Sequence, residues 1–181
     1  IYQFRFDENT GRLTPNTPLK LEMGGFLGPR HYAFHPTQDF VYFSDEQGNS
    51  VTGYRLDTAA GTLSAFQTIS TLAEGHTGRN TTSQIQLTPS GNLLYIPNRG
   101  HNSVAGFTVA ADGRLAQAGR ASTEAVPSAF SLDPEGNDVF AAGSATGQLA
   151  SYRINQETGE LTPLGTYAVG ARPMSVLTTQ L

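Results

Sequence analysis

Side chains suited to acid–base and anion-binding chemistry lie in short loops of this 181-residue sequence. Arg30 and His31 stand together in GPRH, Glu46 follows in SDEQGN, and Arg99 lies in PNRGH. A histidine or a carboxylate can act as a general base, and a planar guanidinium fork binds carboxylate or phosphate groups. If these loops meet in space, they predict a site for acid–base chemistry on a small anionic molecule.

The candidates fall into two roles. The expected catalytic residues are His31, as the first choice of general base, and Glu46, as the second. The expected substrate-binding residues are Arg30, Arg99, Asn80, Gln84 and His101, of which the two amides would orient substrate or water.

Each candidate also has a structural alternative. His31 could simply hydrogen-bond a neighbouring loop, and His101 fits a turn position. Glu46 and Arg99 could form an ion pair between adjacent repeat units, worth about 0–1 kcal/mol if exposed. That alternative is favoured for Glu46 and stays open for Arg99. His35 precedes a proline in a turn and is expected to be exposed scaffold.

The elements that must position these loops form an internal repeat. His35-Pro36 recurs as Thr88-Pro89 and Asp133-Pro134, at spacings of 53 and 45 residues. The apolar run FVYF recurs as LLYI and DVFA at the same spacings. Each copy alternates apolar and β-branched residues between Gly- and Asn-rich turns, which predicts four short strands. In the first copy we expect these strands at 31–35, 39–45, 50–57 and 63–71.

Four strands every ~40–50 residues are typical of a β-propeller blade. The sequence therefore predicts an all-β fold of four-stranded antiparallel blades. The expected units are the end of one blade (1–22), three blades (31–71, 84–124 and 128–168) and the first strand of another (172–180). Such ends would leave open blade edges that could pair with other strands. The opening IYQFRF, without Met, predicts that the natural N-terminus lies upstream.

The repeat places the candidate residues on one face. Glu46, Arg99 and Ser144 occupy equivalent positions between second and third strands. In an up-and-down blade these loops and the loops entering the first strands share the rim of the central channel. The segment 72–82 adds seven residues on the same face, either as a binding loop or as a solvated insertion.

Composition excludes several functions. A net charge of −4 without a Lys/Arg cluster argues against a nucleic-acid partner. The absence of cysteine excludes disulfides and thiolate ligands. No run reaches the ~20 apolar residues of a membrane span, and no His/Asp cluster has metal-ligand spacing. We therefore expect no metal and no cofactor.

The chain resembles the seven-bladed propeller lactonase family, which includes propeller-type 6-phosphogluconolactonases and carboxy-muconate lactonizing enzymes. The segments that carry the resemblance are GPRHYAFHP (28–36), FQTISTL (66–72), NTTSQIQLTPSGNLLYIPNRGHNSVAGFTV (80–109) and VPSAFSLDPEGN (126–137). The resemblance implies a ring of about twice this length. It also favours a cytoplasmic location, although an extracytoplasmic one stays open without the natural N-terminus.

The same resemblance implies a hydrolase that opens a small anionic lactone, such as 6-phosphogluconolactone, with the histidine of GPRH as a catalytic group. Two positions depart from the family pattern. Gln84 stands where an acidic residue is expected, and Ser128 stands where the arginine of a Pro-Arg-Asp-Phe segment is expected. Whether the protein is an enzyme is therefore open at this point. The alternative is a non-catalytic propeller that binds a ligand or assembles with other proteins.

Overall fold

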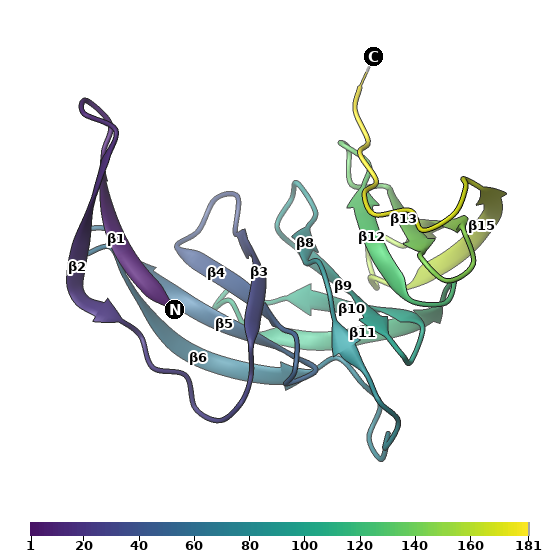
Figure 1. The fold of residues 1–181 in the computed structure, drawn as a ribbon, viewed down its shortest axis with the longest axis horizontal. Helices are drawn as coiled ribbons and strands as arrows, with labels where there is room; N and C mark the ends of the chain where they lie inside the picture. Colours follow the sequence, from purple (N-terminus) through teal and green to yellow (C-terminus); the bar gives the residue numbers. More distant parts are fainter. Residues whose placement is uncertain (181) are drawn as a thin grey trace.

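The computed structural model describes residues 1–180, and within that range it contains strands and turns without a helix. The all-β prediction is confirmed. The sheets follow one another along an arc, with β3, β8 and β12 on its inner side (Figure 1). No helix among the described residues is long and apolar enough to cross a membrane.

The first and third blades are four-stranded antiparallel sheets whose strands pair in chain order. The first blade contains β3 (Pro29–Phe34), β4 (Phe40–Asp45), β5 (Ser50–Asp57) and β6 (Thr62–Ser70). The third blade contains β12 (Pro127–Leu132), β13 (Asp138–Gly143), β14 (Gln148–Ile154) and β15 (Leu161–Ala168).

The innermost strand of the second blade is split in two. The short strands β7 (Thr81–Thr82) and β8 (Gln86–Leu87) both pair with β9. The sheet continues through β9 (Leu93–Arg99), β10 (Ser103–Val109) and β11 (Leu115–Ser122). Pairing thus begins before the expected start at 84.

The two ends of the chain differ from one another. β1 (Tyr2–Asp7) and β2 (Arg12–Lys20) form an antiparallel hairpin. The segment 172–180, expected as a strand, is irregular and pairs with no strand among residues 1–180. Its Thr178 hydroxyl bonds instead to the Leu132 carbonyl.

The second blade is buried on both faces. On β9, Leu93 and Tyr95 pack with the third blade around Phe130, whereas Leu94 and Ile96 pack with the first blade. Because successive strand residues point to opposite faces, a strand between two blades must be apolar throughout. This explains the uninterrupted LLYI run.

A tyrosine on the second strand of a blade ties it to the next blade. The Tyr42 hydroxyl donates to the Gly113 carbonyl at 2.7 Å, and the equivalent Tyr95 donates to Gly159 at 2.9 Å. Burial raises the pKa of Tyr42 to about 12, so it stays a donor. These bonds fix the tilt between neighbouring blades.

His35 is buried, with 9% of its surface exposed, and the expectation of an exposed residue was wrong. Its Nδ1 accepts hydrogen bonds from the backbone N–H groups of Thr37 and Gln38. The turn at Gly91 of the second blade packs against the ring, where an added Cβ would lie 2.4 Å from Nε2. His35 therefore closes a turn and supports a blade contact.

Asp45, at the end of β4, is a fully buried carboxylate that is only half satisfied. Its Oδ2 accepts hydrogen bonds from Ser50 and Thr52, both at 2.7 Å, and its Oδ1 has no partner. Burial raises the pKa of Asp45 above its usual value. At the equivalent position of the second blade, Asn98 is also fully buried and bonds through both side-chain atoms.

Asp45→Asn should stabilise the protein at neutral pH by about 1 kcal/mol, or about 2–4 °C in Tm, because it removes a buried unpaired charge. A pKa raised by folding means that the wild-type stability falls as pH rises through that pKa. The substitution should flatten this fall in thermal melts between pH 4 and pH 8. The mirror change Asn98→Asp should lower Tm, and a lower neutral-pH Tm for Asp45→Asn would contradict the interpretation.

Candidate functional site

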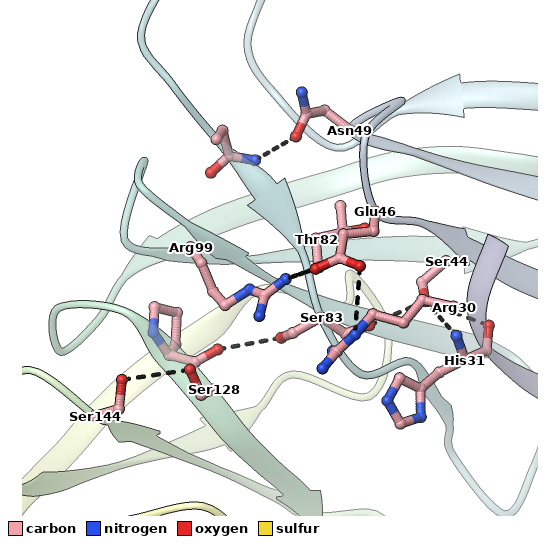
Figure 2. A network of polar contacts seen from close by, with 12 residues as sticks. Arg30, His31, Ser44, Glu46, Asn49, Thr82, Ser83, Arg99, Ser128 and Ser144 are labelled. Atoms are coloured by element: carbon pink, nitrogen blue, oxygen red, sulfur yellow. Dashed lines mark hydrogen bonds and ion pairs between the residues drawn. The ribbon is translucent and has the colours of Figure 1, made fainter. Parts of the chain in front are cut away.

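The candidate site lies where the inner ends of the first and second blades meet. Arg30 and His31 are on β3, Glu46 directly follows β4, and Arg99 ends β9. Figure 2 shows the Arg30 and Arg99 guanidinium groups converging on the Glu46 carboxylate. The loops therefore share one rim, as the repeat register predicts.

Glu46 is held between two arginines. Arg99 Nη2 donates to Glu46 Oε1 and, at 3.0 Å, to the Thr82 carbonyl. Arg30 Nε lies 3.6 Å from Glu46 Oε2. The Glu46 and Arg99 side chains are 27% and 19% exposed, so solvent screens this pair only partly. The ion pair between adjacent blades, considered from the sequence, is present.

This arrangement gives Glu46 a bridging role. Both carboxylate oxygens of Glu46 face guanidinium groups, Oε1 that of Arg99 and Oε2 that of Arg30. The Glu46 backbone is also fixed, since its N–H donates to the Gly28 carbonyl at 2.8 Å. Glu46 fits the role of an anchor for the arginines better than that of a general base.

His31 lies beside this charged group and is exposed. Its backbone N–H donates to Ser44 Oγ at 3.0 Å, and Ser44 Oγ donates to the Ser83 carbonyl of the second blade. Partial desolvation, followed by the charges of Arg30 and Arg99, lowers the pKa of the imidazole, and Glu46 opposes them. A lowered pKa keeps the imidazole neutral at pH 7, which is the form that accepts a proton.

A pocket of about 600 Å³ opens beside the ion pair. Its lining residues are Glu46, Arg79, Asn80, Thr81, Arg99, Gly100 and Val126. It combines two guanidinium groups with a small apolar patch, an arrangement suited to an anionic organic molecule.

Arg79 is the lining residue that sequence reasoning missed. It is exposed and lies in the segment 72–82, the part of the second blade without a counterpart in the repeat. Comparing the copies of the repeat identifies a candidate residue only where the copies share a position. Arg79 has no equivalent position in the other copies. The extra length of the segment was the available signal.

Four of the predicted residues, Arg30, His31, Gln84 and His101, do not line this pocket. Gln84 does not line it, and its buried Oε1 has no partner. The His101 ring contacts His76 edge-on with centroids 5.0 Å apart, and its Nδ1 lies 2.9 Å from Ser103 Oγ. Burial, followed by His76 and Arg120, lowers the pKa of His101. These contacts indicate a structural role for the His101 ring.

Ser128 stands on β12 next to the same rim (Figure 2). Its Oγ lies 3.4 Å from Ser144 Oγ, while the Ser83 hydroxyl donates to the Pro127 carbonyl. The bond from Ser83 to Pro127 joins the second and third blades without a charge, and the Ser128–Ser144 contact lies within the third blade. Among the described residues, no group of three or more His, Cys, Asp or Glu side chains could hold a metal ion.

The antiparallel blades and the polar inner rim are those of a β-propeller with a candidate anion site. The family model described as "Lactonase, 7-bladed beta-propeller" matches residues 1–178, and the chain belongs to that family.

Curated relatives agree with this assignment. The chain is 38% identical over 168 residues to a 6-phosphogluconolactonase of Pectobacterium carotovorum, covering 92% of this chain and 51% of that protein. It is 37% identical over 167 residues to a 6-phosphogluconolactonase of Yersinia pestis, covering 92% and 50%. The chain thus spans about half the length of the curated relatives it matches.

Solved structures show the same architecture. A periplasmic gluconolactonase of Pseudomonas aeruginosa superposes with a TM-score of 0.85 at 26% identity, over 93% of this chain and 48% of that one. A Lactobacillus plantarum protein superposes with the same TM-score at 25% identity, over 95% and 50%.

Gly100 permits the close contact between the turn after β9 and the segment 72–82. Its φ is +127°, and an added Cβ would lie 2.1 Å from the Arg79 carbonyl oxygen. Gly100→Ala should therefore displace Arg79 and destabilise the protein by about 1–3 kcal/mol, measured by denaturant unfolding. Gly75→Ala is the matched control, because Gly75 also has positive φ but has nothing within 4 Å of an added Cβ. Equal losses for the two variants would show that the contact is unimportant.

Proposed function

We propose that the protein is a lactone hydrolase acting on a small anionic lactone. The observation that carries the proposal is the pocket between the first two blades, which Arg79 and Arg99 line, together with the exposed His31 beside the Arg30–Glu46–Arg99 group. Relatives named 6-phosphogluconolactonase support lactone opening as the reaction.

The working site in this proposal belongs to a complete ring. The relatives are about twice as long as this chain, and a propeller leaves only short edges when its ring is closed. The chain then supplies about half of the rim, including the junction described above. The exposed aromatic residues Tyr2, Phe4 and Tyr32 would be covered in the closed ring.

The chemical step needs a base and a stabilised oxyanion. Water adds its oxygen to the lactone carbonyl carbon, while His31 takes the proton that water loses. The carbonyl oxygen becomes an oxyanion, which a guanidinium group at the rim stabilises. When the intermediate collapses, the bond between the acyl carbon and the ring oxygen breaks. The ring oxygen takes the proton back from His31, which leaves a hydroxy acid and a neutral imidazole.

The remaining residues hold the substrate. In this proposal Arg79 binds the anionic substituent, since a guanidinium fork matches a phosphate or carboxylate. Glu46 orients Arg99 and Arg30 through its two carboxylate oxygens. Gln84 and Ser128 do not line the pocket, so the arginines supply the positive charge that the anionic substrate needs. The name of the curated relatives favours 6-phosphogluconolactone as the substrate.

His31→Ala should reduce kcat for 6-phosphogluconolactone by ~10²–10⁴-fold, the range for loss of a general acid or base. Because the pKa of His31 is lowered, wild-type kcat/KM should begin to fall at a lower pH than it would with an ordinary imidazole as the base. The measurement is a lactone-hydrolysis assay corrected for spontaneous opening, with unchanged Tm as the folding control.

Normal turnover by a folded His31→Ala protein would remove His31 from the mechanism. Absence of turnover by the wild-type protein on a panel of lactones would instead favour the non-catalytic ligand-binding propeller.

A further inference from the structure

The side chain of Asn80 is fully engaged with the protein. Its Nδ2 donates to Asn49 Oδ1 at 2.9 Å and to Asn98 Oδ1 at 3.0 Å. Its Oδ1 accepts the backbone N–H of His101 at 3.0 Å. Both amide hydrogens are used, so Asn80 has no donor left for a substrate.

The partners of Asn80 are rigid and come from two blades. Asn49 occupies the left-handed region, with φ of 53°, in the turn before β5 of the first blade. Asn98 is fully buried in the second blade and also accepts from Thr71 Oγ1 at 2.7 Å. The Asn80 carboxamide therefore joins both blades at the wall of the candidate site (Figure 2 shows the contact at Asn49).

Arg79 is the neighbour that this arrangement fixes. Its carbonyl packs against Gly100, and its side chain lines the pocket. Arg79 is exposed, so few contacts of its own hold the guanidinium in place. The backbone conformation at Asn80 therefore sets the position of the Arg79 Cα atom and the direction of its side chain.

We infer that Asn80 is a positioning residue, which holds Arg79 in the place where it binds the anionic substituent of the lactone. This inference rests on the proposed function and adds to it a preference for phosphorylated over neutral lactones. A guanidinium attached to a fixed backbone binds an anion more tightly than one on a mobile backbone, because less conformational entropy is lost on binding.

The chemistry of the contacts requires asparagine. Alanine would leave the Asn49 and Asn98 oxygens without their donor. Aspartate would keep an acceptor for the His101 N–H but would place a carboxylate against two amide oxygens. Both substitutions should loosen the chain at Arg79 and Asn80 while leaving the strands of the blades intact.

The test compares two lactones that differ by one phosphate. For 6-phosphoglucono-δ-lactone, Asn80→Ala should raise KM about tenfold and leave kcat within about threefold. For the neutral glucono-δ-lactone, KM should stay within about twofold. An equal rise in KM for both substrates would overturn the inference, since general damage to the site moves both. Arg114→Ala, at an exposed arginine in a turn, is the control for loss of charge elsewhere.

A double-mutant cycle tests the route through Arg79. In an Arg79→Ala background, Asn80→Ala should change KM for the phosphorylated lactone by less than about twofold. Fully additive effects would show that Asn80 acts independently of Arg79.

A further readout separates this inference from the proposed function. The backbone ¹H–¹⁵N heteronuclear NOE of Arg79 should fall in Asn80→Ala and stay unchanged at Gly75. A wild-type protein that hydrolyses no lactone would overturn the proposed function. An Arg79 NOE that is unchanged by Asn80→Ala would overturn the inference, whatever the activity.

Discussion

The burial of the second blade on both faces is the constraint on which the rest of the structure depends. Leu93 and Tyr95 must face the third blade while Leu94 and Ile96 face the first, so the register of β9 cannot slip by one residue. The ends of β3, β4 and β9 are therefore brought together at the inner rim, whichever residues stand there. The packed scaffold thus specifies a meeting place for loop residues, and the loops supply its chemistry.

At that meeting place, charge is arranged around one carboxylate. Glu46 holds Arg99 and Arg30, while partial desolvation, followed by the charges of the same arginines, lowers the pKa of the neighbouring His31 imidazole. One cluster thus provides a cation for an anionic reactant and a base in its reactive form. The segment 72–82 adds a third cation, Arg79, whose backbone carbonyl packs against Gly100 and whose neighbour Asn80 bonds to both blades.

The repeat made most of the fold predictable, because register and turn chemistry recur in each copy. It predicted a shared rim for Glu46 and Arg99, and the ion pair between them was one of two interpretations open from the sequence. The positions of residues outside the repeat were harder to predict. Arg79 lies in an insertion without a counterpart in the other copies. The position of the Gln84 side chain depends on the interruption between β7 and β8, where Gln84 lies. The burial of His35 depends on the Gly91 turn of the next blade, a contact that no local pattern encodes.

An anionic ligand should bind at the junction of the first and second blades, at the Arg30–Glu46–Arg99 group beside which His31 lies. Titration of the protein with 6-phosphogluconate, followed by NMR of the histidine Cε1–H signals, tests this expectation most directly. We expect a saturable shift of the His31 signal. The signal of His35, which is buried directly after β3, should stay unshifted. Saturable binding that shifts other signals and leaves both the His31 signal and the Arg79 amide signal unchanged would contradict a binding site at this junction.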